Sequence, residues 1–264
     1  MAMKVIAVSN GKGGVGKTHL SVHLATGLSE GHQVLYLDFD WQGNGTKWVT
    51  RGIPGDRSVT AFDLLERGKL EQRHVRKVTQ TLSIVPGSME MKGVDVVLAG
   101  KDVGQIVLRE ALRNQQVGEW DYVVVDCPPA LGMATLNAFC AADFVLAPVT
   151  PTAISLEGLA PLEKALAQCQ RVLGAKAYLL GCVIFGADES KRQLQVVREA
   201  VSVWRAPTLA SKADLLLYES EIRRSAAGEE LFPQNLLAWG GADKRGAEDY
   251  GAVLRETIRR MEAA

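Results

Sequence analysis

Short apolar runs alternate with longer helical stretches along nearly the whole chain of 264 residues. Three of these runs, beginning at Val5, Tyr122 and Tyr178, are almost continuously hydrophobic. Strands buried on both faces of a parallel sheet have this composition, because helices cover both sides. The alternation therefore predicts an α/β fold, a mostly parallel twisted sheet with helices on both faces, as a single domain over residues 1–264.

The same pattern gives the expected elements. We predict strands at residues 5–8, 34–37, 82–85, 122–125, 144–148, 178–185 and, more weakly, 207–209. We predict helices at residues 17–29, 105–114, 134–141, 155–172, 193–203 and 247–261. In such a sheet, ligands bind at the carboxyl ends of the strands, so functional residues are expected directly after the apolar runs.

Composition narrows the classes of function. Thirty Lys and Arg balance thirty Asp and Glu, which argues against a surface that attracts nucleic acid everywhere but allows a local basic patch. The four cysteines include no C-x-x-C pair, so disulfides and zinc knuckles are not expected. No run of 18 apolar residues and no signal-peptide pattern is present, so we expect a cytoplasmic protein without a membrane span.

A glycine-rich segment lies between the first apolar run and the first helical stretch. It satisfies G-x-x-x-x-G-K-[ST] in the strand–loop–helix context of phosphate-binding loops. Glycines let consecutive N–H groups surround phosphate oxygens, and the following helix presents its positive end to the same anion. Lys17 is expected to reach the β- and γ-phosphates, and the Thr18 hydroxyl to coordinate Mg²⁺. The expected nucleotide-binding residues are Gly11, Lys12, Gly13, Gly14, Val15, Gly16, Lys17, Thr18 and His19.

Lys12 is a second lysine inside this loop. Binding phosphate within one chain does not require it, because Lys17 already serves that purpose. A further cation beside the γ-phosphate would stabilise transition-state charge, as an arginine finger does. We therefore interpret Lys12 as a catalytic residue together with Lys17.

Two acidic segments follow later apolar runs. Asp38 and Asp40 are two residues apart after a strand, so their carboxylates can act at one site. One would support Mg²⁺, and the other would orient or deprotonate the attacking water. Asp126 ends four apolar residues in a Walker B pattern and is expected at the Mg²⁺. The Pro-Pro pair that follows is a candidate γ-phosphate switch.

These segments resemble the ParA/MinD family of deviant Walker-motif ATPases, and more closely its ParA branch. The resemblance covers roughly residues 3–258 and includes "LSIVPGSMEMKGVDVVLAG", "DYVVVDCPPALGMATLNAFCAADFVLAPV", "SLEGL" and "RGAEDY". It implies ATP and Mg²⁺ as cofactors, a sandwich homodimer in which Lys12 crosses to the partner's phosphate, and Asp40 as the residue that positions water. The metal site implied is Thr18, Asp38 and Asp126.

The resemblance also implies partners. Members of the ParA branch bind DNA non-specifically as ATP dimers, which makes them nucleoid-associated, and are stimulated by a ParB-type centromere-binding protein or a cargo adaptor. The candidate DNA contacts are Arg223, Arg224, Lys244 and Arg245, and three further arginines, Arg255, Arg259 and Arg260, are expected on the outside of the last helix. Whether the cargo is a plasmid, a chromosome or a protein assembly is left open.

Three residues or segments depart from the family pattern. Trp41 stands where Pro is usual, which leaves the geometry of the first switch open. His19 replaces a second Thr or Ser after the loop. The segment "FGADES" at 185–190 lacks the Asn or Arg found in many relatives, so no residue is named as an adenine contact.

Other functions fit these residues less well. A MinD-like ATPase on a membrane surface would end in a basic, bulky helix, whereas residues 250–261 predict a helix that packs on the sheet. A metabolic P-loop enzyme would have no need for Lys12. Zinc binding by His19 and His23 lacks a third ligand, and an iron–sulfur role for Cys127 lacks a second cysteine loop.

Overall fold

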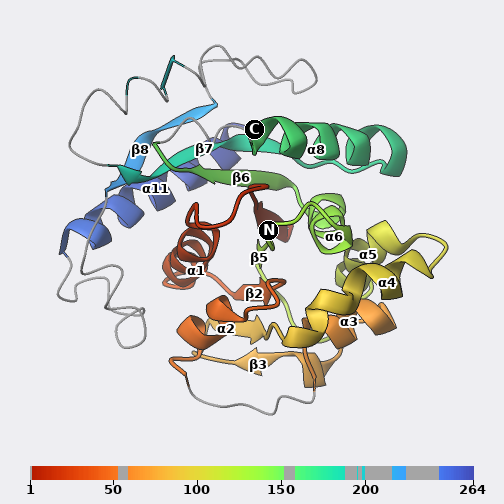
Figure 1. Ribbon diagram of the computed structural model, residues 1–264. Coiled ribbons are helices and arrows are strands. Elements are labelled where there is room, and N and C mark those ends of the chain that lie inside the picture. Colours follow the sequence, from red (N-terminus) through yellow and green to blue (C-terminus); the bar gives the residue numbers. More distant parts are fainter. Residues whose placement is uncertain are drawn as a thin grey trace.

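A twisted sheet forms the centre of the computed structural model, with helices on both of its faces (Figure 1). The structure describes residues 2–52, 59–151, 158–187, 195, 198–199, 216–223 and 244–264. In this part of the chain the sheet has eight strands in the order β3-β4-β2-β5-β1-β6-β7-β8. The strands are β1 (Lys4–Val8), β2 (Val34–Asp38), β3 (Arg76–Lys77), β4 (Leu82–Val85), β5 (Tyr122–Asp126), β6 (Phe144–Val149), β7 (Tyr178–Ala187) and β8 (Leu217–Arg223).

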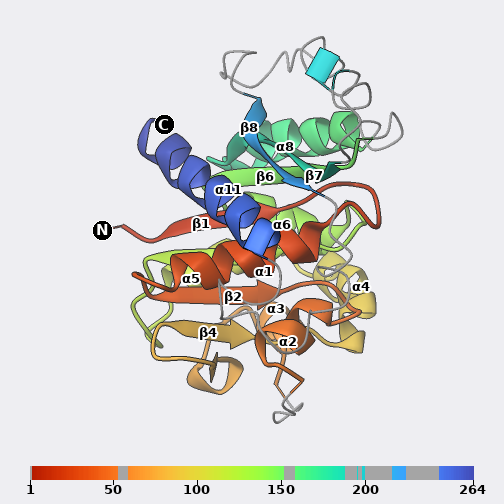
Figure 2. The same ribbon diagram turned by 90° about the vertical axis from the view of Figure 1, so that its left-hand side faces the viewer.

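The helices divide between the two faces of this sheet. They are α1 (Lys17–Leu28), α2 (Asn44–Val49), α3 (Ala61–Arg67), α4 (Val94–Ala99), α5 (Val107–Arg113), α6 (Met133–Ala141), α8 (Leu159–Leu173) and α11 (Lys244–Glu262), with short 3-10 turns η1 (Gln72–His74), η2 (Met89–Gly93) and η3 (Gly104–Ile106). One hydrophobic core lies under α1 and α11, and the other lies under α3 to α6 and α8. Figure 2 shows α1 and α11 side by side on the first of these faces.

The predicted α/β architecture is confirmed. All strand pairs are parallel except β3 with β4, which is antiparallel. Strands β3 and β8 and the short helices α2, α3 and α4 were not predicted. The start of the helix predicted at 155–172 lies outside the described residues, and α8 is described from Leu159. The strand predicted at 207–209 and most of the helix predicted at 193–203 lie outside the described residues.

Strand register brings the acidic segments together. Asp38 and Asp126 are paired positions on β2 and β5, and Val8 of β1 is the partner of Asp126 on its other side. All three residues stand at the carboxyl ends of parallel strands. The phosphate loop, which follows Val8, therefore begins beside both carboxylates.

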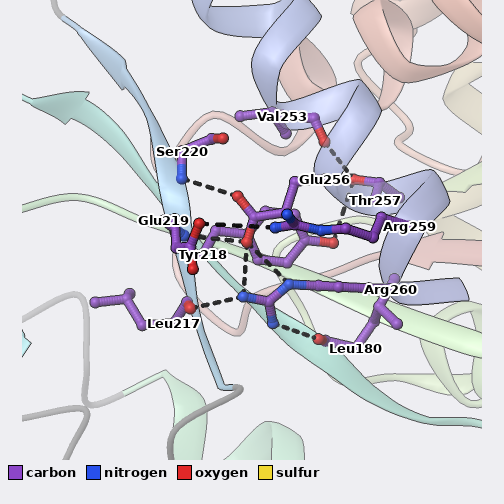
Figure 3. Close-up of polar contacts among 10 residues, drawn as sticks. All are labelled: Leu180, Leu217, Tyr218, Glu219, Ser220, Val253, Glu256, Thr257, Arg259 and Arg260. Carbon is purple, nitrogen blue, oxygen red and sulfur yellow. Dashed lines mark hydrogen bonds and ion pairs between the residues drawn. The ribbon is translucent and has the colours of Figure 1, made fainter. Parts of the chain in front are cut away.

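Two side chains of helix α11, Glu256 and Arg260, form a buried ion pair and hydrogen-bond to backbone groups of β7 and β8 (Figure 3). The Glu256 carboxylate accepts backbone N–H groups from Glu219 and Ser220 at 3.0 and 2.9 Å, and it pairs with Arg260 at 2.7 Å. Arg260 also donates to the carbonyl groups of Leu180 and Leu217. The helix thus provides hydrogen-bond partners for backbone N–H and carbonyl groups at the β7 and β8 side of the sheet.

The position expected for Arg260 was wrong. Its side chain is only 11% exposed, and its guanidinium lies 4.1 Å from the centroid of the Tyr218 ring. The backbone of Gly181, at φ 153°, leaves the necessary space, because a Cβ there would lie 2.9 Å from the guanidinium. Arg255 and Arg259 are exposed, as expected.

Among the residues that the structure describes, no helix combines the length and the apolar character that a membrane span requires. The apolar side of α11 includes Val253, Thr257 and Met261, which are buried against the sheet. The expectation that this helix packs on the sheet is confirmed.

Replacing Glu256 with Gln should lower the free energy of unfolding by about 2–4 kcal/mol at pH 7, because Arg260 would be left buried beside a neutral group. Burial acts to raise the pKa of Glu256, but N–H groups of Ser220 and Glu219 and the Arg260 guanidinium outweigh it and lower that pKa. The stabilisation is therefore present above the usual glutamate pKa and is lost as the pH falls through the lowered value. Urea unfolding of both proteins at pH 7 and at acidic pH measures this, with Glu262→Gln, at an exposed position, as the control. A difference between E256Q and wild type that grows on acidification would contradict the assignment.

Candidate functional site

The phosphate loop has the backbone shape that its glycines permit. Gly14 and Gly16 have φ values of 74° and 91°, in the left-handed region that side chains rarely adopt. Gly16 is the N-cap of α1, whose first turn is free of acidic residues. Left-handed residues next to a helix N-terminus direct N–H groups toward one concave surface, which is suited to an anion.

Gly16 is also required by packing. A Cβ on this residue would lie 2.5 Å from the ring of Phe185, which is the part of β7 that faces the loop. The aromatic ring therefore rests directly on the loop backbone. It also lies 5.4 Å from the imidazole ring of His19.

Lys17 is directed into the loop. Its side chain is buried, and its Nζ donates a hydrogen bond of 2.7 Å to the carbonyl of Lys12. Burial lowers the pKa of Lys17, whereas the nearby Asp126 acts in the opposite direction. A buried cation on a glycine-rich loop is a strong partner for phosphate, because little water competes for it.

The backbone of Lys12 is held from the neighbouring strand through Asn10. The Asn10 amide oxygen accepts the N–H of Lys12 at 3.0 Å, and its amide nitrogen donates to the carbonyl of Pro148 at 2.8 Å. Gly158 leaves room for this side chain, since a Cβ there would overlap the Asn10 oxygen. The sequence pattern did not indicate Asn10, whose partners are up to 138 positions away.

Asp38 is buried and already has three donors. The N–H and the hydroxyl of Thr46 lie 2.7 and 2.6 Å from Oδ2, and the N–H of Asp40 lies 3.2 Å from Oδ1. The Thr46 hydroxyl in turn accepts the N–H of Gly87. Burial raises the pKa of Asp38. Asp38 therefore anchors α2 and the segment after β4, a role that the sequence did not indicate, and its support of Mg²⁺ stays a prediction.

Asp40 begins a tight turn at the edge of the site. Its Oδ1 accepts the N–H of Gln42 at 2.9 Å, and its carbonyl accepts the N–H of Gly43. The Trp41 ring lies under the ammonium of Lys92, 3.9 Å from the ring centroid. This cation–π contact holds the segment in the absence of the proline usual at this position.

Asp126 has the features of a metal-binding carboxylate. It is fully buried, its Oδ2 accepts the Tyr36 hydroxyl at 3.1 Å, and its Oδ1 has no hydrogen-bond partner among the described residues. Burial, followed by the charge of Asp38, raises the pKa of Asp126, while the hydroxyls of Thr18 and Tyr36 act to lower it. A buried carboxylate that retains one oxygen without a hydrogen-bond partner, beside a hydroxyl, fits a hard cation.

The donor set fits Mg²⁺ rather than a metal held by protein alone. The described residues contain no group of three His, Cys, Asp or Glu that could bind a metal ion. Mg²⁺ commonly takes one or two protein oxygens and completes its shell with phosphate and water. Thr18 and Asp126 would supply such oxygens next to the phosphate loop.

The two histidines of α1 make aromatic contacts. The His19 ring makes an edge-to-face contact with Trp48, with ring centroids 4.8 Å apart. The His23 ring stacks on Tyr250 of α11, with ring centroids 3.6 Å apart. Burial lowers the pKa of each histidine to about 4.

Cys127 is buried, and burial raises the pKa of its thiol, so this cysteine lacks thiolate character.

The candidate DNA contacts differ in their surroundings. The Arg223 guanidinium pairs with Asp249 of α11 at 2.7 Å, and the Arg223 N–H donates to the same carboxylate. Arg224 lies outside the described residues. Lys244 and Arg245 are exposed in the first turn of α11.

The sheet, the loop shape and the two buried aspartates together define a P-loop nucleotide-binding protein. A family model described as an AAA domain matches residues 3–177. The chain is 39% identical over 264 residues to the chromosome partitioning protein ParA of Myxococcus xanthus, covering 97% of this chain and 88% of that protein. It is 32% identical over 263 residues to the chromosome partitioning protein ParA of Caulobacter vibrioides, covering 98% and 95%.

The chain belongs to the ParA/MinD family of P-loop ATPases, in the ParA branch. Its fold is also similar to that of cobyrinic acid a,c-diamide synthase from Mycobacterium smegmatis with bound ADP and magnesium. That likeness has a TM-score of 0.81 at 24% identity and covers 98% of this chain and 96% of the other. At this identity the likeness concerns the fold alone.

Proposed function

We propose that the protein is a dimeric partition ATPase that binds Mg-ATP, hydrolyses it to ADP and phosphate, and binds DNA without sequence preference in its ATP state. The observation that carries this proposal is the pair of lysines in one phosphate loop, with the Lys17 ammonium turned inward onto the carbonyl of Lys12. One cation is thus committed to the loop of its own chain. The side chain of Lys12 extends from the same loop and is half-buried.

The chemistry follows from these positions. The N–H groups of the loop and Lys17 would bind the β- and γ-phosphates. Thr18 and Asp126 would hold Mg²⁺, which neutralises charge on the phosphate oxygens when bound. Asp40 would orient a water molecule toward the γ-phosphorus; the new P–O bond forms as the bond to the ADP oxygen breaks.

Lys12 would complete the site of a second copy. Its N–H and carbonyl are fixed by Asn10 and Lys17, so its backbone is held while its side chain remains available. A lysine that reaches the γ-phosphate of the opposite protomer stabilises transition-state charge and joins the two copies only when a triphosphate is present. The protein would then be a dimer with ATP and a monomer with ADP.

DNA binding would use the exposed side of α11. Lys244 and Arg245 begin this helix, and Arg255 and Arg259 are exposed further along it. A protein without net charge has little general attraction for DNA, so a dimer that combines two local patches would gain most of its affinity by neutralising more phosphates. In this proposal a ParB-type protein or a cargo adaptor stimulates hydrolysis, and the protein is cytoplasmic and nucleoid-associated while it segregates plasmid or chromosomal DNA.

The surroundings of α11 disfavour a membrane-surface ATPase. The apolar side of this helix is buried on the sheet, and hydrogen bonds of Glu256 and Arg260 with backbone groups of β7 and β8 hold it there. Inserting that side into a bilayer would expose the core beneath it.

Changing Lys17 to Ala should weaken ATP binding by about tenfold or more, because the variant lacks a buried ammonium at the phosphate. Titration of a fluorescent ATP analogue measures the affinity. Lys47→Ala, which removes an exposed lysine of α2, is the matched control and should bind as wild type does. Equal affinities for wild type and K17A would refute the phosphate-loop assignment.

Lys12→Ala and Asp40→Ala should separate dimerisation from hydrolysis. The first variant retains Lys17 and the loop backbone, so it should bind ATP within about threefold of wild type yet remain monomeric and inactive. The second should form a dimer with Mg-ATP and hydrolyse ATP at least tenfold more slowly, because the attacking water is no longer oriented. Light scattering and phosphate release measure both properties. A D40A protein that stays monomeric with Mg-ATP would contradict these roles.

Changing Lys244 and Arg245 together to Ala should reduce affinity for random duplex DNA equally across sequences. The slope of log affinity against log salt should flatten by about 1 for each DNA phosphate that the variant no longer neutralises. Retardation of duplex DNA at several salt concentrations, with ATP, with ADP and without nucleotide, measures this. Arg73→Ala, at an exposed residue of η1 that pairs with Glu71, is the control. DNA that is never retarded while ATP still causes dimerisation would show that this protein does not act through DNA.

A further inference from the structure

The Tyr36 hydroxyl is a polar group inside an otherwise apolar strand. Tyr36 lies in β2, two residues before Asp38, and its side chain is fully buried. Its hydroxyl reaches the neighbouring strand β5 and donates to Oδ2 of Asp126 at 3.1 Å. A phenylalanine would fill almost the same volume without this bond, so the hydroxyl requires an explanation of its own.

The structure makes room for this hydroxyl at one position of α2. A Cβ on Gly45 would overlap the Tyr36 oxygen, closer than any non-bonded contact allows. Gly45 is the second residue of the short helix α2, where glycine is less favourable than alanine. The hydroxyl of Tyr36 therefore occupies space that a more favourable helical residue would otherwise fill.

The Tyr36 hydroxyl donates its single proton to the Asp126 carboxylate. A tyrosine has one proton to donate, and an ionised carboxylate is the strongest acceptor within its reach. The Ser21 oxygen lies 3.2 Å from the Tyr36 oxygen and 3.1 Å from the carbonyl of Thr18. Ser21 can therefore donate to either of them while Tyr36 donates to Asp126.

The consequence concerns the two oxygens of Asp126. The terminal torsion of an aspartate is broad and roughly two-fold, so the carboxylate can turn about its axis unless a partner fixes it. Tyr36 engages Oδ2, and Oδ1 has no hydrogen-bond partner among the described residues. The Thr18 hydroxyl also acts on this carboxylate, and the bond from Tyr36 engages Oδ2 while Oδ1 remains available.

We infer that Tyr36 is a positioning residue for the metal: its hydroxyl holds the Asp126 carboxylate so that Oδ1 is presented to Mg²⁺. Ser21 joins the same hydroxyl to the backbone of Thr18, the other residue expected to bind the ion. This inference rests on the proposed function, because it requires that Mg²⁺ accompany the nucleotide at this site. It adds a third side chain, buried in β2, to the metal site that Thr18 and Asp126 would form.

The experiment compares Tyr36→Phe with wild type in nucleotide binding rather than in activity alone. A fluorescent ADP analogue is titrated in EDTA and at a series of free Mg²⁺ concentrations. We expect equal affinities in EDTA and an increase of about tenfold in the Mg²⁺ concentration that half-saturates the tightening, as is typical when an outer-shell partner of a ligand is removed. Excess Mg²⁺ should restore most of the wild-type affinity and hydrolysis rate.

Tyr218→Phe is the matched control. This tyrosine is also buried, its hydroxyl lies 3.2 Å from the Thr257 hydroxyl, and it belongs to β8 rather than to the site. Unfolding by urea should show a loss of stability for both variants, but only Tyr36→Phe should change the Mg²⁺ requirement. If the two variants have the same Mg²⁺ requirement as wild type, Tyr36 has only a packing role and the inference is wrong.

Ser21→Ala separates the bond to Asp126 from general loosening of the site. It leaves the hydrogen bond between Tyr36 and Asp126 intact, so we expect a change of less than threefold in the half-saturating Mg²⁺ concentration. A change as large as that in Tyr36→Phe would overturn the inference. Wild-type protein whose affinity for ADP does not respond to Mg²⁺ would instead refute the proposed function itself.

Discussion

The parallel register of β1, β2 and β5 is the constraint on which the site depends. It sets Val8, Asp38 and Asp126 at neighbouring strand ends, so that the loop after Val8 begins beside two buried acids. A shift of one residue in either pairing would turn a carboxylate to the other face of the sheet. Two hydrophobic cores, one on each face, prevent such a shift because the strand side chains already have apolar neighbours.

The burial that fixes this register also gives the two acids different roles. Asp38 is satisfied by three donors from its own chain, whereas Oδ1 of Asp126 has no hydrogen-bond partner in the described part of the chain. The first carboxylate consequently maintains the shape of the loop that carries Asp40. The second carboxylate keeps an unbonded, buried oxygen whose negative charge a nucleotide-bound cation can neutralise.

The sequence predicted the elements whose signals are local. Six strands of the sheet, the phosphate loop and the acidic residues after the strands follow from apolar runs and glycine spacing over a few residues. Strand β3 has only two residues, and the apolar character of β8, "LYESEIR", is interrupted by Glu219, Ser220 and Glu221. Neither has the continuous hydrophobic character from which the other strands were predicted.

The sequence did not predict the contacts that join distant segments. Asn10 and Pro148 are 138 positions apart, and Tyr36 and Asp126 are 90 apart, so no local pattern connects them. The burial of Arg260 was missed for the same reason, since its partners in β7 and β8 are separated from α11 along the chain. A helical arginine is ordinarily placed in solvent unless a buried carboxylate such as Glu256 is known to face it.

The close approach of Tyr36 to Gly45 limits how this chain can vary over evolutionary time. Any side chain at position 45 would collide with the tyrosine oxygen while that oxygen is present. A mutational path that replaces the glycine must therefore pass first through a change of Tyr36 itself, because the ring carbon Cζ would also lie 2.9 Å from the new Cβ. The reverse path has the opposite order, with glycine appearing before tyrosine. The two positions therefore form an ordered pair, in which a strand residue decides what the helix above it can carry.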